Sequence, residues 1–63
     1  MKITQLIVVN DHGEDTFYTV GLNGVLEIIE HEPRGEGDKW FYDVVRENKV
    51  IRIFNFKEVV FDK

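Results

Sequence analysis

The amino-acid sequence predicts an all-β domain, a small antiparallel meander of five to six strands. Apolar and aromatic residues alternate with polar residues, or cluster, in six short runs, and turn-forming residues separate most of them. The runs are Ile3–Val9, Thr16–Val20, Val25–His31, Lys39–Arg46, Val50–Phe56 and Val59–Phe61. A length of 63 residues is enough for one domain only, so residues 1–63 form a single small all-β unit.

The first run is apolar on both of its faces. Ile3, Ile7 and Val9 point to one side, and Leu6 and Val8 point to the other. A strand of this kind needs cover on both faces, so it is expected in the centre of a sheet or between two layers.

Turn residues then follow over positions 10–15. A two-residue loop at His12-Gly13 would set Val9 opposite Thr16 and Ile7 opposite Tyr18. This register matches apolar with apolar residues on both faces of the predicted hairpin.

Asn23-Gly24 is the strongest local turn signal in the chain. Asn-Gly between two β-rich runs is typical of a type I′ hairpin, because both of its central residues need a positive φ. The hairpin would set Val20 opposite Glu27 and Tyr18 opposite Ile29.

The third run ends at Pro33, which has no N–H to donate to a sheet. A helix over residues 25–32 is disfavoured, because the window is short and lies between Gly24 and Pro33. A loop with two glycines follows at residues 34–38. The fourth run is rich in aromatic residues, with Trp40, Tyr42 and Val44 on one face.

A tight turn near Asn48-Lys49 would return the chain and set Val44 opposite Ile53. Residues 55–58 could form one helical or 3₁₀ turn before a last short strand. Strands that are apolar on both faces leave more apolar surface than one flat sheet can cover. The sequence therefore predicts either closure into an SH3-like barrel or an open sheet that dimerises.

Composition restricts the class of protein. The formal net charge is −4, divided between −6 over residues 1–38 and +2 over residues 39–63. There is no cysteine, so neither a disulfide nor a thiolate metal site is possible. No apolar run reaches the roughly 18 residues of a membrane span, and the N-terminus has no signal-peptide pattern. We expect a soluble, cytoplasmic protein.

The sequence contains no clear motif for a catalytic, metal-binding or phosphate-binding site. The chain has no serine or cysteine nucleophile, and His12 and His31 are its only imidazoles. The acidic turns around both histidines match no calcium loop. The glycine pair Gly35 and Gly37 is flanked by acids, which repel phosphate. We therefore expect no enzyme activity, no metal and no cofactor.

A binding role remains. The first hypothesis is a protein-interaction module that binds another protein or a second copy of itself. Its apolar anchors would be Trp40 and Tyr42, and its charged rim would be Glu30, Glu32, Glu36 and Asp38. The alternative is a nucleic-acid-binding small β-barrel that uses Arg46, Lys49, Arg52 and Lys57, although the net charge opposes phosphate binding.

The stretch Gly35-Glu36-Gly37-Asp38, which precedes an aromatic run and a last hairpin, carries a resemblance over residues 30–44 and 51–55. This half of the chain resembles short uncharacterised proteins encoded by bacteriophages and prophages of Gram-positive bacteria. The resemblance implies an intracellular, early-expressed accessory protein. It assigns no functional residue.

Overall fold

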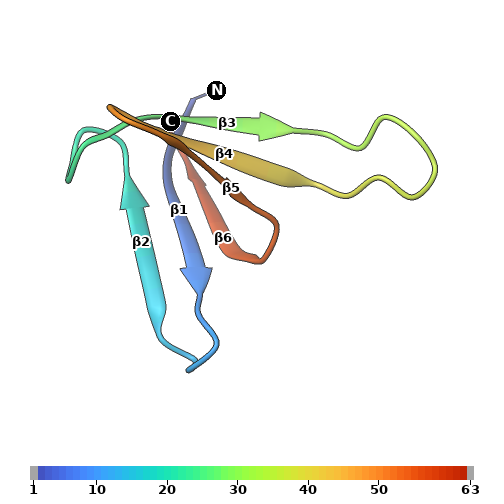
Figure 1. Cartoon of the computed structure of the whole chain (residues 1–63), viewed down its shortest axis with the longest axis horizontal. Helices are drawn as coiled ribbons and strands as arrows, with labels where there is room; N and C mark the ends of the chain where they lie inside the picture. The colour runs from blue at the N-terminus through green and yellow to red at the C-terminus, as the bar shows by residue number, and fades with distance from the viewer. Residues whose placement is uncertain (1, 63) are drawn as a thin grey trace.

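The computed structural model describes residues 2–62 and consists of six antiparallel β-strands in two three-stranded sheets (Figure 1). The strands are β1 (Ile3–Val9), β2 (Asp15–Thr19), β3 (Val25–His31), β4 (Phe41–Arg46), β5 (Val50–Ile53) and β6 (Phe56–Phe61). The all-β, antiparallel prediction is confirmed. Within residues 2–62 there is no helix, and so none that could cross a bilayer.

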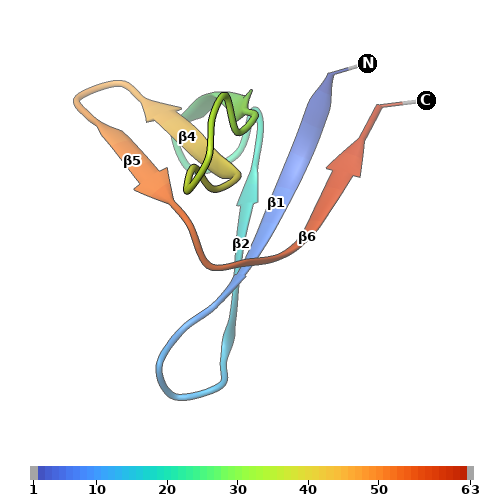
Figure 2. The ribbon, with the colours of Figure 1, turned by 90° about the vertical axis from the view of Figure 1, so that its right-hand side faces the viewer.

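The two sheets have the strand orders β2-β1-β6 and β3-β4-β5. Their strands run in clearly different directions, and the sheets pack face to face near the start of β3 (Figures 1 and 2). The core lies between them. Its fully or nearly fully buried members are Leu6, Val25, Ile28, Tyr42 and Val44.

The predicted meander is confirmed within β1–β2 and within β3–β4–β5, but it is interrupted between β2 and β3, and the predicted barrel does not close. β6 returns to pair with β1 rather than with β5, so the last strand joins the first sheet. Within residues 2–62 no strand of one sheet pairs with a strand of the other, so the barrel does not close. Face-to-face packing of two sheets solves the covering problem without closure, because each sheet covers one apolar face of the other.

The register of the first hairpin differs from the prediction by one residue. Val9 lies opposite Asp15, and Leu6 rather than Ile7 lies opposite Tyr18. The reason is the loop: the side-chain oxygen of Asn10 accepts hydrogen bonds from the backbone N–H groups of His12 and Glu14, which makes a three-residue loop. Because side chains alternate along a strand, a slip of one residue changes which of them share a face.

Asn23-Gly24 forms the predicted turn but not the predicted hairpin. Both residues have positive φ, 52° and 80°, and the N–H of Val25 donates to the carbonyl of Leu22 at 3.1 Å. Beyond the turn the strands separate, because β2 pairs with β1 and β3 pairs with β4. The turn is therefore a corner between the sheets. It lets Tyr18 and Ile28 face the core from opposite layers.

The corner gives a first testable prediction. We expect Gly24→Val to reduce the free energy of unfolding by more than about 1 kcal/mol, because a β-branched residue resists a positive φ. A Cβ atom here would come no nearer than 3.7 Å to the Arg46 guanidinium, so backbone strain is the cause rather than a clash. Urea unfolding measures the loss. Gly35→Val is the control, since Gly35 has no positive φ, and an equal loss in both variants would contradict the explanation.

The last hairpin is shifted from its predicted register by two residues. Val44 lies opposite Ile51, not Ile53, and the N–H of Arg46 donates to the carbonyl of Lys49 at 2.8 Å. A shift of two residues leaves each side chain on its predicted face of the sheet, because side chains alternate between the faces with a period of two. The expected helical turn at residues 55–58 is absent, because β6 already begins at Phe56.

Candidate functional site

The outer face of the sheet β3-β4-β5 carries a compact group of aromatic and charged side chains. Antiparallel pairing sets His31 of β3 opposite Phe41 of β4, and Asp43 of β4 opposite Arg52 of β5. Phe54 follows β5 immediately. Neighbouring strands therefore bring together five side chains from three separate segments of the sequence.

Asp43 is the centre of this group. One carboxylate oxygen lies 3.0 Å from His31 Nε2, and the other accepts from Arg52 Nε at 3.2 Å. Among residues 2–62, Asp43 is the one buried charged residue, with 8% of its surface exposed. Aspartate is disfavoured in a central strand. Two cationic or hydrogen-bonding neighbours offset that cost here.

The ring of Phe41 contacts both of the side chains that bind the Asp43 carboxylate. The His31 ring stacks on it at 4.4 Å between centroids, and the Arg52 guanidinium lies 4.6 Å from its centroid. Because β4 lies between β3 and β5, these contacts reach Phe41 from opposite sides of its strand. Phe54 extends the row at 5.3 Å. The aromatic row is therefore held in one arrangement from several directions.

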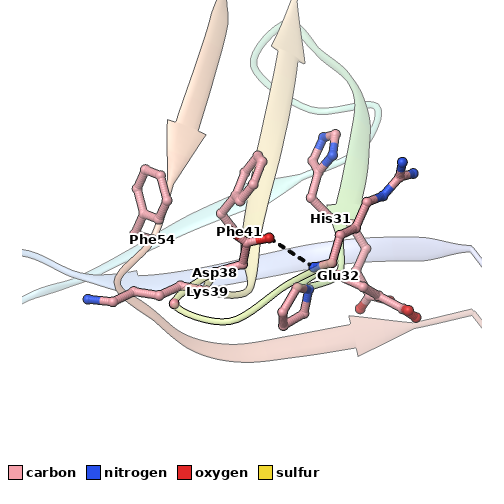
Figure 3. Close-up of a pocket in the computed structure, with 10 residues that line it drawn as sticks. His31, Glu32, Asp38, Lys39, Phe41 and Phe54 are labelled. Atoms are coloured by element: carbon pink, nitrogen blue, oxygen red, sulfur yellow. Dashed lines mark hydrogen bonds between the residues drawn. The ribbon is translucent and has the colours of Figure 1, made fainter.

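A groove of about 730 Å³ opens between this row and the loop that joins β3 to β4. We call it the acidic–aromatic groove. Its lining consists of Glu30, His31, Glu32, Pro33, Arg34, Gly37, Asp38, Lys39, Phe41 and Phe54. Figure 3 shows the rings of His31, Phe41 and Phe54 side by side on one wall, with Lys39 extending away from them.

The loop side of the groove is fixed by a local hydrogen-bonded turn. The Asp38 carboxylate accepts from the backbone N–H of Arg34 at 3.1 Å, drawn as the dashed line in Figure 3. The backbone N–H of Asp38 donates to the carbonyl of Gly35 at 3.2 Å. Gly37 has a φ of 87°, which a glycine adopts readily. The two glycines thus shape this turn beside the groove.

The structure brings together three of the four predicted rim residues. Glu30, Glu32 and Asp38 line the acidic–aromatic groove, whereas Glu36 is an exposed turn residue that does not. Trp40, which is 44% exposed, also lies outside the lining.

Tyr42 cannot act as a surface anchor in this structure. Only 3% of it is exposed, and its ring packs edge-on against Phe56 in the core. Its hydroxyl donates to Glu30 Oε2 at 2.9 Å. Burial, followed by the hydrogen bond to Glu30 and the charge of that carboxylate, raises the pKa of Tyr42 to about 12. Tyr42 therefore orients a groove carboxylate from within the core.

The alternative basic set is divided between the two sheets, with Arg46, Lys49 and Arg52 on the β4–β5 hairpin and Lys57 on β6. Arg52 is paired with Asp43, and Lys57 of the other sheet is paired with Asp15 at 3.1 Å. Arg46 donates to the carbonyl of Asn23 at 2.7 Å, at the corner between the sheets. Partners within the chain thus occupy three of the four side chains, and nothing in their placement favours a phosphate-binding stripe.

Four residues that build this site were not predicted from the sequence as partner-binding residues: His31, Phe41, Asp43 and Phe54. One signal was present in the sequence: an aspartate in the middle of the most aromatic run, where a β-branched residue is expected. Its partners could not be found from the sequence, because they depend on the strand register.

The arrangement has limited chemical capacity. A histidine held by a carboxylate supplies two of the three members of a nucleophilic triad, but the chain has no serine or cysteine to complete it. The hydroxyls of Thr4 and Thr19 are used within the other sheet. Within residues 2–62, no three histidine or acidic side chains are grouped as metal ligands would be. What the groove offers is shape, ring surface and charge.

No protein-family model, curated protein or solved structure matches this chain. The geometry of the groove and of the sheet edges is therefore the basis for any functional assignment.

Proposed function

We propose that the chain is a non-enzymatic, cytoplasmic protein-interaction module, and that its acidic–aromatic groove binds a basic segment of another protein. The partner segment presents a lysine or arginine next to an apolar side chain. The resemblance to short phage proteins supports an accessory role on a host protein, and the absence of cysteine suits a reducing compartment.

One observation carries the proposal: rings and carboxylates share the same groove. Phe41 and Phe54 offer flat apolar surface, and the three carboxylates of Glu30, Glu32 and Asp38 outnumber the two cationic lining residues, Arg34 and Lys39. The stem of a long basic side chain packs on rings while its head group meets carboxylates. The chain's net charge of −4 also favours the approach of a basic partner.

Pre-organisation adds to this support. His31 and Arg52 are tied to the buried Asp43 and flank Phe41, so the aromatic row loses little freedom when a partner binds. Glu30 is likewise oriented by the Tyr42 hydroxyl.

The test uses a short peptide that alternates arginine with leucine, added to the isotope-labelled protein. We expect the amide signals of His31, Lys39, Phe41 and Phe54 to move most, because these residues line the groove. Phe54→Ala should weaken binding by roughly fivefold or more, as truncation of an aromatic anchor does.

Phe17→Ala is the matched control. Phe17 and Phe54 are similarly exposed, at 55% and 51%, but Phe17 lies on the other sheet. Equal losses of affinity in the two variants, or signal changes spread away from the groove, would reject the proposed site. Binding of random single-stranded DNA at 50 mM salt, weakened steeply by added salt, would favour the nucleic-acid alternative instead.

We also propose that the chain self-associates as a dimer at micromolar concentration. Each three-stranded sheet has two edge strands with one neighbour only, and several large apolar side chains near them are exposed. An edge strand presents unpaired backbone groups, and a second copy can pair with them. Sedimentation that gives a monomer mass at every concentration would contradict this.

A further inference from the structure

A second, smaller groove lies where the two sheets fail to close. It has a volume of about 280 Å³, and its apolar lining residues are Ile3, Val20, Leu26, Ile28, Ile29 and Phe61. We call it the seam groove. The start of β1, at Ile3, and the end of β6, at Phe61, line this groove together with β3.

β3 forms one wall of the seam groove and is the longest of the four edge strands. It has seven residues and pairs with β4 only, whereas the edge strands β2, β5 and β6 have five, four and six. A strand added to this edge would also cover apolar side chains beside it. β6, the other edge strand that lines this groove, contributes only Phe61, whereas β3 contributes the consecutive residues 26–30.

A β-bulge explains why apolar side chains face outward here. The register between β3 and β4 shifts between Val25 and Glu27, so Leu26 is an extra residue. The bulge lets both Val25 and Ile28 point into the core, and it leaves Leu26 more than half exposed in the seam groove.

We infer that β3 pairs antiparallel with β3 of a second copy of this chain, with the two-fold axis at Ile29. This inference rests on the proposed self-association and assigns it to one surface. A two-fold contact must be complementary to itself, because the same patch supplies both sides. β3 supplies one wall of the seam groove and also the apolar side chains that would fill the groove of the second copy.

Pairing geometry and charge select the register. In a regular antiparallel pair, opposite residues are of one hydrogen-bonding type, so a strand that pairs with itself is centred on a residue and not between two. A centre at Glu30 sets two glutamates against each other, and a centre at Ile28 brings no oppositely charged side chains together. A centre at Ile29 sets Ile29 against itself and Glu27 against His31, which is complementary.

The register can be tested with a single cysteine, because the natural chain has none. Ile29→Cys places two thiols directly opposite each other across the axis, within the range that a disulfide bridges after small adjustment. Mild oxidation of the full chain should convert most of this variant into a disulfide-linked dimer. Val50→Cys, on the exposed edge strand β5, is the matched control and should remain mostly monomeric.

A second pair of variants tests the same surface without cross-linking. Ile29→Lys places two positive charges together at the axis, so the dimer dissociation constant measured by sedimentation should rise at least about tenfold. Val50→Lys should change it by less than about twofold. Circular dichroism identifies any variant that fails to fold, and the cysteine pair then carries the test.

The outcomes distinguish a failure of the β3 assignment from a failure of the proposed self-association. If the natural chain is a monomer at all concentrations, the proposed dimer and this inference both fail. If it is a dimer but Val50→Cys cross-links as well as or better than Ile29→Cys, or Ile29→Lys leaves the dissociation constant unchanged, the β3 assignment alone is overturned.

Discussion

We expect Leu6→Ala to lower the free energy of unfolding by about 2–5 kcal/mol, the usual cost of truncating a buried leucine. Leu6 has 0% of its surface exposed, and it faces the second sheet from the central strand β1. A 63-residue domain has a total stability of only about 3–9 kcal/mol. The variant should therefore lose at least about a fifth of its stability, and its melting temperature should fall by about 8 °C or more.

Leu22→Ala is the matched control. It removes the same atoms from the exposed corner between β2 and β3, where little apolar surface is buried, so its cost should stay below about 1 kcal/mol. Thermal unfolding followed by circular dichroism compares both variants with the natural chain. Similar melting temperatures for the two variants would mean that the core does not lie between the sheets.

The strands themselves could be predicted because their signal is local. Short apolar-rich runs bounded by polar or turn-forming residues predicted both ends of Ile3–Val9 and Val25–His31 correctly. Errors appeared where one strand passes into the next. The fourth run begins two residues later than predicted, at Phe41, and the fifth ends at Ile53, because the chain leaves the sheet there.

The pairing of strands could not be predicted because it depends on contacts distant in the sequence. Asn23-Gly24 forms its turn as expected, yet the two runs that it joins belong to different sheets. The turn signal at Asn23-Gly24, considered alone, predicts a hairpin between β2 and β3. Packing of Tyr18 and Ile28 into one core between two layers is the solution that buries more apolar surface.

The candidate site was predicted only in part, for a related reason. Along the fourth run, Tyr42 and Val44 share one face and Phe41 and Asp43 share the other, and both faces carry aromatic surface. Sequence alone does not say which face is buried. The face that sequence reasoning selected for binding is the buried one, so Tyr42 lies in the core and Asp43 organises the outer surface.

We expect the folded protein to lose stability of the order of 2–3 kcal/mol between about pH 10 and pH 12, because of Tyr42 alone. Its pKa is raised from the usual 10.0 to about 12, mainly by burial and then by Glu30. Below pH 10 the phenol is neutral in both the folded and the unfolded chain. Above that pH the unfolded chain loses the proton first, so the folded state loses this contribution until the pH passes about 12.

Tyr42→Phe isolates the effect. It removes the ionisable group and the hydrogen bond to Glu30, so it should cost about 1 kcal/mol at neutral pH and then resist alkali better than the natural chain. Urea unfolding at several pH values, with tyrosinate absorbance recorded in parallel, measures both quantities. Tyr18→Phe, which changes the only other tyrosine, should keep the alkaline loss of the natural chain. If Tyr42→Phe and the natural chain lose stability equally above pH 10, the phenol of Tyr42 is not held neutral in the core.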